Sequence, residues 1–477
     1  MRTNIVEKNV TWITVSQFGL IAIQIINILI VTRLIGVGDV GLFAVALSAL
    51  NVSLLLRDLG TSMTVIQKKK ITVTFLCSIH TINILSGYIS TLIMLIVAPI
   101  LSVIYQSKDL GIILLLAGLS VSYSSYGQLN YSLLQKESEF DKIARIDLTS
   151  TVIGSITGII AALLGLGVYA LALNFIITNL ISSTLFIKSK NNEQVRFWYK
   201  LNYILAVAKK CYGITSYNII HFVTKNCDVF LIGYYFGAYK LGIYVMGLKF
   251  MMMPYQLITV IVNKSIHPIL SSRKTEKDKV FDSYIAINKI VILLSGSFVT
   301  FLLIFRHELI SILLDPKWAN LTDTLLYLLP SGFLLAVASL SNIYLIILDN
   351  EKLLMKFGIF EMLLIVGAIV ASSFYNYYTM LLVLFIVNLS LSLLIMVYTA
   401  RSIHAYNKNI FLNYQSCFYR IILLFLLVSF TYNLSSQISS SSSTNAIFSL
   451  SFGLLLAYIL VYRSLIRELE YFRRIIA

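Results

Sequence analysis

The sequence predicts an all-α integral membrane protein with about fourteen transmembrane helices. Apolar stretches of roughly 20 residues, enough for a helix to cross the hydrocarbon layer of a bilayer, recur along its 477 residues. Only 12% of the residues are charged, about half the usual share of a globular domain. The mean hydropathy is +0.86. These observations exclude an ordinary soluble enzyme.

The individual helices follow from apolar windows between charged or turn-forming breaks. A first group of six is expected near residues 10–31, 40–66, 75–104, 111–134, 145–164 and 168–187. A second group of six is expected near residues 213–235, 241–266, 284–305, 322–348, 353–374 and 378–400. A last pair is expected near residues 417–434 and 446–463.

The basic residues predict the orientation of these helices. If the N-terminus is cytoplasmic, 27 of the 37 Lys and Arg residues fall in cytoplasmic segments and only five in external ones. The positive-inside rule therefore places both termini in the cytoplasm. The net charge of +16 is then mainly an orientation signal that faces anionic membrane lipids, and nucleic acid is not an expected partner.

An internal repeat relates the two groups of six helices. Residues 27–47 (NILIVTRLIGVGDVGLFAVAL) align with residues 228–248 (DVFLIGYYFGAYKLGIYVMGL) at a constant offset of 201, with Gly36/Gly237 and Gly41/Gly242 identical. Because each group has an even number of spans, the repeat is parallel and its axis lies along the membrane normal.

The expected domain organisation follows from this repeat. Between the lobes, a segment with apolar residues at three- and four-residue spacing and several basic residues predicts an amphipathic helix on the cytoplasmic leaflet; an ordinary solvated linker is the alternative. The domains are an N-terminal six-helix lobe (1–190), this linker (191–212), a C-terminal six-helix lobe (213–400), and two additional helices with a basic cytoplasmic tail (401–477).

Six charged residues lie far from the predicted helix ends. At 1.5 Å per residue, Arg57 lies roughly 16 Å from the inner lysine cluster that begins at Lys68. A charge at this depth costs about 3 kcal/mol or more, so such residues usually face a bundle interior or a water-filled cavity. The candidate substrate-binding cations are Arg57, Lys225 and Lys249, and the candidate ion-coupling or cavity acids are Asp58, Asp228 and Glu361. A structural alternative remains for Lys225 and Asp228, whose i, i+3 spacing allows them to neutralise each other.

Arg57 and Asp58 are adjacent, but adjacent residues of an α-helix point about 100° apart. We therefore expect them not to form an ion pair and to have separate roles. The following Gly60-Thr61-Ser62 is expected to loosen the helix locally, as in the discontinuous helices of transporters.

Neither an enzyme nor a metal site is indicated. The five histidines are dispersed, and the four cysteines form neither a CxxC motif nor a Cys/His cluster. No GxxxxGK[ST] loop for ATP is present. We expect no cofactor, no metal and no catalytic residues, so that conformational cycling would use an ion gradient, the membrane potential or the gradient of the substrate.

Several segments resemble the Wzx-type polysaccharide flippases, a branch of the multidrug/oligosaccharidyl-lipid/polysaccharide exporter superfamily. TRLIGVGDVGLFAV, then DLG and VIQKKKIT, are similar to the first two helices of that family. LLQKESEFDKIARIDLTSTVIGSITGIIAALLGLGVYAL resembles its fourth-to-fifth helix connection, and DVFLIGYYFGAYKLGIYVMGLKFMMMPYQLI its seventh and eighth helices. LLDPKWAN is similar to a family loop with a Gly/Asp-x-x-Trp element. The resemblance covers roughly residues 10–330.

The resemblance implies a MATE-like fold, with a V-shaped pair of lobes around a cavity that opens alternately to each side. It implies an undecaprenyl-pyrophosphate-linked oligosaccharide as cargo, flipped from the cytoplasmic to the periplasmic leaflet of a bacterial inner membrane for O-antigen, capsule or exopolysaccharide assembly. The polysaccharide polymerase and the chain-length machinery are further implied partners. The resemblance also implies that cationic residues of the cavity engage pyrophosphate or acidic sugars, and Arg57, Lys225 and Lys249 are the candidates for this role by their depth and not by a matching motif.

Two other functions remain open. A proton- or sodium-coupled antiporter for drugs or organic cations would use Asp58, Asp228 or Glu361, but three cations at depth suit a cation cavity poorly. A membrane polysaccharide polymerase or ligase would need a large, arginine-rich external loop, which the sequence lacks.

Overall fold

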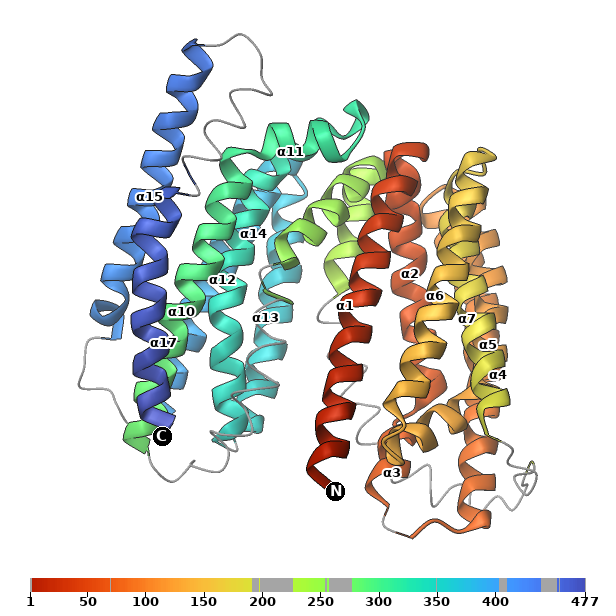
Figure 1. Ribbon diagram of the computed structural model, residues 1–477. Coiled ribbons are helices and arrows are strands. Elements are labelled where there is room, and N and C mark those ends of the chain that lie inside the picture. Colours follow the sequence, from red (N-terminus) through yellow and green to blue (C-terminus); the bar gives the residue numbers. More distant parts are fainter. Residues whose placement is uncertain are drawn as a thin grey trace. The chain divides into compact units, whose positions relative to one another are not determined.

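The computed structural model describes residues 2–68, 70–190, 197, 226–253, 255–256, 277–348, 350–402, 410–438, 453 and 455–476. The elements in this part of the chain are helices (Figure 1). Eleven of them are long and apolar enough to cross a membrane, and the apolar part of α1, Phe18–Leu34, adds a shorter stretch. The predicted all-α membrane fold is confirmed. The chain forms two compact units, Met1–Gly242 and Ile243–Ala477.

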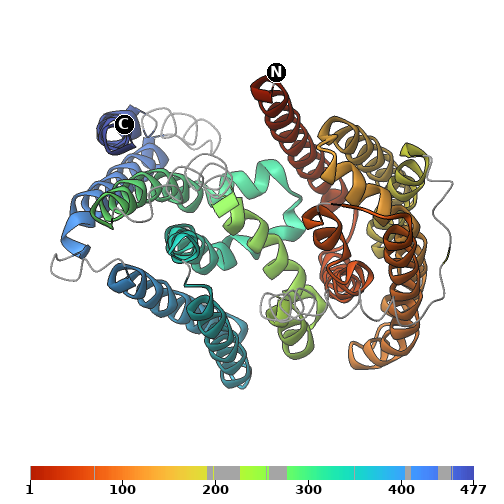
Figure 2. The same ribbon diagram turned by 90° about the horizontal axis from the view of Figure 1, so that it is seen from below.

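In the first unit, helices that follow each other in the chain pack as antiparallel pairs, and further contacts join these pairs. Helix α4 packs on α5, α6 packs on α7 and on α1, and α5 also packs on α7 and α2. Figure 2 shows these helices from below, roughly along their axes. Its helices are α1 (Arg2–Leu34), α2 (Val37–Asp58), α3 (Thr61–Gln67), α4 (Val73–Ile104), α5 (Lys108–Lys136), α6 (Phe140–Leu163) and α7 (Val168–Ser189).

The second unit surrounds a core of large buried side chains on α10, α12 and α15, among them Tyr284, Tyr344 and Tyr414. Its elements are α10 (Lys277–Ile304), α11 (Arg306–Leu313), the 3-10 turn η2 (Pro316–Trp318), α12 (Leu321–Ile347), α13 (Glu351–Ser372), α14 (Tyr377–Ser402), α15 (Ile410–Ile438), the π-helical turn η3 (Tyr458–Tyr462) and α17 (Arg463–Ile476). The segment expected to be a basic tail is therefore helical. Helix α17 packs on α10, where Lys289 Nζ lies 3.3 Å from Glu468 Oε1.

The seventh and eighth predicted helices differ from those observed. The structure shows one helix, Asn226–Met253, where two were expected on either side of a turn. The turn survives as a local departure at Gly237, whose φ of 77° is accessible to glycine because it lacks a Cβ. Residues 213–225 and 257–266 lie outside the described residues, as does the predicted amphipathic linker apart from Phe197.

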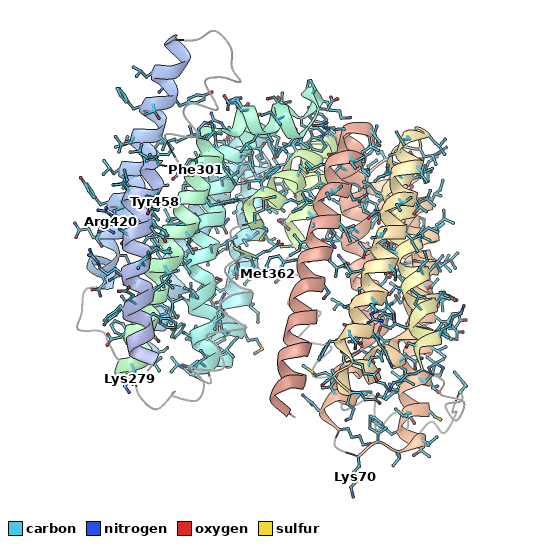
Figure 3. The ribbon with its side chains drawn as sticks, viewed as in Figure 1. Lys70, Lys279, Phe301, Met362, Arg420 and Tyr458 are labelled. Carbon is cyan, nitrogen blue, oxygen red and sulfur yellow. The ribbon has the colours of Figure 1, made fainter. Side chains whose placement is uncertain are left out.

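The basic loops lie where the predicted topology requires within each unit. Lys70, between α3 and α4, lies at the same end of the first unit as the N-terminus (Figures 1 and 3). Lys279, near the start of α10, lies at the same end of the second unit as the C-terminus. Each unit therefore has basic residues at the end that holds its chain terminus.

The internal repeat reappears as a symmetric helix crossing. A Cβ added to Gly41 of α2 would overlap the carbonyl oxygen of Ala238, and a Cβ added to Gly242 would overlap that of Val37. Val37 and Ala238 are related by the same offset of 201 as the two glycines. In each copy of the repeat, the glycine thus packs directly against the backbone of the other copy. Only glycine permits so close an approach.

We predict that Gly41→Ala and Gly242→Ala each destabilise the protein by about 1–3 kcal/mol, because the added methyl group forces the helices apart. Thermal unfolding of the purified protein in detergent measures the loss. Gly38→Ala is the matched control on the same helix, since a Cβ there meets nothing within 4 Å. Equal melting temperatures for all three variants would contradict the proposed close packing.

Candidate functional site

The second membrane span, Val37–Gln67, is broken in its C-terminal half. Helix α2 ends at Asp58, and Leu59 and Gly60 then adopt left-handed conformations with φ of 42° and 70°. Helix α3 begins at Thr61. The loosening expected at Gly60-Thr61-Ser62 is thus confirmed as a complete break. The left-handed backbone conformation costs a non-glycine residue such as Leu59 on the order of 1 kcal/mol or more. Contacts with the surrounding residues must therefore stabilise it.

Asp58 stabilises this break. Its Oδ1 accepts hydrogen bonds from the backbone N of Ser62 at 3.3 Å, from the Ser62 hydroxyl at 2.6 Å and from Gln128 Nε2 of α5 at 3.0 Å. A carboxylate here satisfies donors that the start of a helix leaves without intrahelical partners. Asp58 therefore joins the end of α2 to the start of α3 and ties both to α5.

The other end of α3 is also fixed from α5. Lys136 Nζ donates to the carbonyl oxygens of Val65 at 3.0 Å and Ile66 at 3.4 Å, and to that of Lys68. A cation at the last carbonyls of a helix complements the helix dipole. Opposite charges thus hold the two ends of this short helix.

Arg57, the residue before Asp58, points into different surroundings. Its Nη1 donates to Ser124 Oγ of α5 at 2.5 Å, and its carbonyl oxygen accepts from the Ser86 hydroxyl at 2.7 Å. Its Nε is buried and has no hydrogen-bond partner among the described residues. No ion pair to Asp58 is present in that part of the chain, as the angle between adjacent helical residues predicted. The guanidinium therefore keeps unused donor capacity.

A polar cavity of about 260 Å³ opens beside Arg57 inside the first unit. Four helices line it: Arg57 comes from α2, Asp147 from α6, and one face each from α5 and α7. The complete lining is Arg57, Ser124, Gly127, Gln128, Tyr131, Asp147, Asn179, Ser182, Ser183 and Phe186. A water-accessible space with a charged wall is the usual setting for an ionisable residue within a membrane span.

More than half of the sequence matches a known protein family. The model of a family described as "Polysaccharide biosynthesis protein" matches residues 30–323, more than half of the chain. The chain belongs to this family. The resemblance to polysaccharide flippases is thereby confirmed. The protein is a membrane transporter of polysaccharide biosynthesis.

Two relatives of this protein are named for glycan biosynthesis. The chain is 22% identical over 316 residues to the succinoglycan biosynthesis transport protein ExoT of Rhizobium meliloti (strain 1021), and the match covers 66% of this chain and 63% of that protein. It is 20% identical over 372 residues to the lipopolysaccharide biosynthesis protein WzxC of Escherichia coli (strain K12), covering 76% of this chain and 75% of that protein.

Two solved structures show the same fold. The lipid II flippase MurJ, in an inward closed conformation, superposes with a TM-score of 0.73 at 13% identity, covering 96% of this chain and 100% of that chain. An inward-facing multidrug resistance MATE family transporter of the MOP superfamily superposes with a TM-score of 0.61 at 15% identity, covering 81% and 95%. At these identities the likeness concerns the fold alone.

None of the other predicted site residues that the structure describes lines the Arg57 cavity. Asp228 Oδ1 accepts from the backbone N of Val229 at 2.9 Å, and Lys225 lies outside the described residues. In the second unit, the side chain of Lys249 is exposed. Glu361 of α13 is half-buried. Among the five candidates within the described residues, Arg57 alone lines this cavity, and Asp58 is its neighbour in the chain.

Sequence reasoning missed Asp147 and Asn179, although a signal for them was present. Ser124, Gly127, Gln128 and Tyr131 of α5 recur at i, i+3, i+4 and i+7, the spacing of one helical face. The cavity-lining residues of α7, which start at Asn179, follow the same spacing. A polar stripe along an otherwise apolar helix indicates a lined cavity.

Within the described residues no group of three His, Cys, Asp or Glu could hold a metal ion.

We predict that Asp58→Ala destabilises the protein by about 1–3 kcal/mol, because the Ser62 and Gln128 donors lose a partly buried acceptor. Asp58→Asn keeps one carbonyl oxygen and should lose less. Thermal unfolding measures both losses, with the exposed Asp109→Asn as a matched control. If Asp58→Asn unfolds like the wild type but abolishes transport, Asp58 acts as an ion-coupling group rather than as a cap.

Proposed function

We propose that the protein flips undecaprenyl-pyrophosphate-linked oligosaccharide repeat units from the cytoplasmic to the periplasmic leaflet by alternating access. The product would serve the assembly of O-antigen, capsule or exopolysaccharide in a bacterial inner membrane. The family match and the transporter fold support movement of a glycan precursor. The observation that carries the choice of an anionic, lipid-linked cargo is Arg57, a cation within a membrane span whose guanidinium has unused donors beside a polar cavity.

The chemistry of Arg57 suits such a cargo. A guanidinium presents several donors in a fixed fork that matches phosphate and carboxylate oxygens. Its cost within the hydrocarbon layer is several kcal/mol, and a single neutral hydroxyl, Ser124, offsets only part of it. An anionic headgroup that passes the site would supply the missing acceptors. Lys249, exposed on the helix Asn226–Met253, is the second cation that we assign to this role.

Moving a lipid headgroup breaks no covalent bond, so the proposal requires no catalytic residue and no cofactor. The basic ends of the two units (Figure 3) support cytoplasmic N- and C-termini through the positive-inside rule. The polysaccharide polymerase and the chain-length machinery would take up the product.

Complementation of a deletion strain tests this function. We predict that deletion stops the appearance of surface glycan while lipid-linked repeat units accumulate on the cytoplasmic side. Arg57→Ala should lower export by about 10- to 100-fold, the effect of losing a hydrogen-bonded charge worth about 1.5–3 kcal/mol, and Arg57→Lys should restore part of it. Arg420→Ala is a matched control, since Arg420 also lies in a membrane span but points outward from α15 (Figure 3).

Normal export in the deletion strain would refute the flippase function. If Arg57→Ala and Lys249→Ala both support normal transport while Asp58→Asn abolishes it, the anion site is wrong and a cation antiporter is favoured.

A further inference from the structure

The cavity beside Arg57 contains two opposite charges that do not pair with each other. Arg57 lies within 4.0 Å of no carboxylate, and the Asp147 carboxylate accepts no hydrogen bond, within the described part of the chain. Asn179 Nδ2 donates to the carbonyl oxygen of Phe175 at 2.9 Å, which leaves its side-chain oxygen for the cavity. The walls therefore offer unused donors on one side and unused acceptors on another.

This arrangement distinguishes between classes of ligand. A cation enclosed in the cavity would use Asp147 but would be repelled by Arg57, and a phosphate enclosed there would use Arg57 but would be repelled by Asp147. The anionic headgroup of the proposed cargo passes Arg57 and is not enclosed. A ligand with several hydroxyl groups can use both charges at once, because each hydroxyl donates one hydrogen bond and accepts others. The lining thus fits a neutral or weakly charged polyol better than either ion alone.

Aromatic side chains complete the lining. Tyr131 of α5 and Phe186 of α7 pack edge to face with ring centroids 5.2 Å apart, and both line the cavity. Ligand pockets commonly combine such apolar rings with a few fixed polar groups. The rings offer a surface for the C–H groups of a sugar, while Asp147, Asn179 and Gln128 face its hydroxyls.

The size of the cavity limits the ligand to a small one. Its volume of about 260 Å³ is just below the roughly 300–1,000 Å³ of pockets that hold drug-sized molecules. A single sugar ring matches this space, and a whole oligosaccharide does not. We propose that the cavity formed by Arg57, Tyr131, Asp147, Asn179 and Phe186 is a subsite for one sugar residue of the transported glycan. The inference rests on the proposed flippase function, to which it adds a recognition site inside the first unit.

Binding to the purified full-length protein in nanodiscs tests the subsite. One probe is the oligosaccharide repeat released by mild acid from the surface glycan of the source strain, observed by saturation-transfer difference NMR. The other is inorganic pyrophosphate, observed by phosphorus NMR. We expect Asp147→Ala to weaken oligosaccharide binding about tenfold or more, as loss of a charged acceptor does, with pyrophosphate binding retained or strengthened because the repelling carboxylate is gone. Asp147→Asn should fall between wild type and Asp147→Ala because it keeps one acceptor oxygen.

Asp109→Ala is the matched control, since the Asp109 carboxylate binds Tyr169 at 2.8 Å on an exposed surface and does not line the cavity. Retained pyrophosphate binding shows that each variant is folded. Tyr131→Leu should also weaken oligosaccharide binding, whereas Tyr131→Phe should keep most of it.

Three results would overturn the subsite. The first is equal oligosaccharide binding by wild type and Asp147→Ala. The second is binding of pyrophosphate but not of oligosaccharide by the wild type, which would make the cavity an anion site. The third is unchanged oligosaccharide binding by Asp147→Asn together with transport that no longer responds to a proton or sodium gradient, which would assign Asp147 to ion coupling. The flippase function survives all three, and fails only if the deletion strain exports its glycan normally.

Discussion

The carboxylate of Asp58 stabilises a break in the second membrane span, and the position of Arg57 depends on that break. Backbone groups released in a hydrocarbon layer must find partners inside the protein. Asp58 supplies them at the start of α3, and Lys136 supplies them at its end. Arg57 lies in the last turn of α2, directly before this anchored break, and lines the cavity. The acid serves the structure and leaves the neighbouring base available for a ligand.

A second constraint acts at the helix crossing made by the repeat. Gly41 and Gly242 allow two backbones to approach where any side chain would overlap a carbonyl oxygen. In lipid, such close packing is a main source of attraction between helices, because burial of apolar surface drives little association there. The crossing fixes the start of α2, and the cap at Asp58 fixes its end, so the helix that carries Arg57 is anchored at both ends by features of the sequence.

The sequence predicted the fold well because hydropathy and charge bias directly reflect the bilayer. It also predicted that Arg57 and Asp58 have separate surroundings, since adjacent helical residues diverge, and that the chain loosens after Asp58. It did not predict the cavity. Asp147 lies near the start of its predicted span, so its depth did not mark it as a candidate. The polar stripe from Asn179 indicates a cavity only together with the packing of α7 on α5, which the sequence does not reveal. The two helices expected on either side of residue 237 appear as one because Gly237 absorbs the turn within it.

The proposed subsite requires that the glycan enters the cavity beside Arg57 during transport. Site-specific photocrosslinking in living cells tests this most directly, with a benzophenone side chain in place of Ser182, which lines the cavity. Ile156, on the exposed face of α6, is the comparison position. We predict adducts recognised by a glycan-specific antiserum at position 182 and none at position 156. Equal labelling at both positions, or none at position 182 in a strain that actively exports its glycan, would contradict the account.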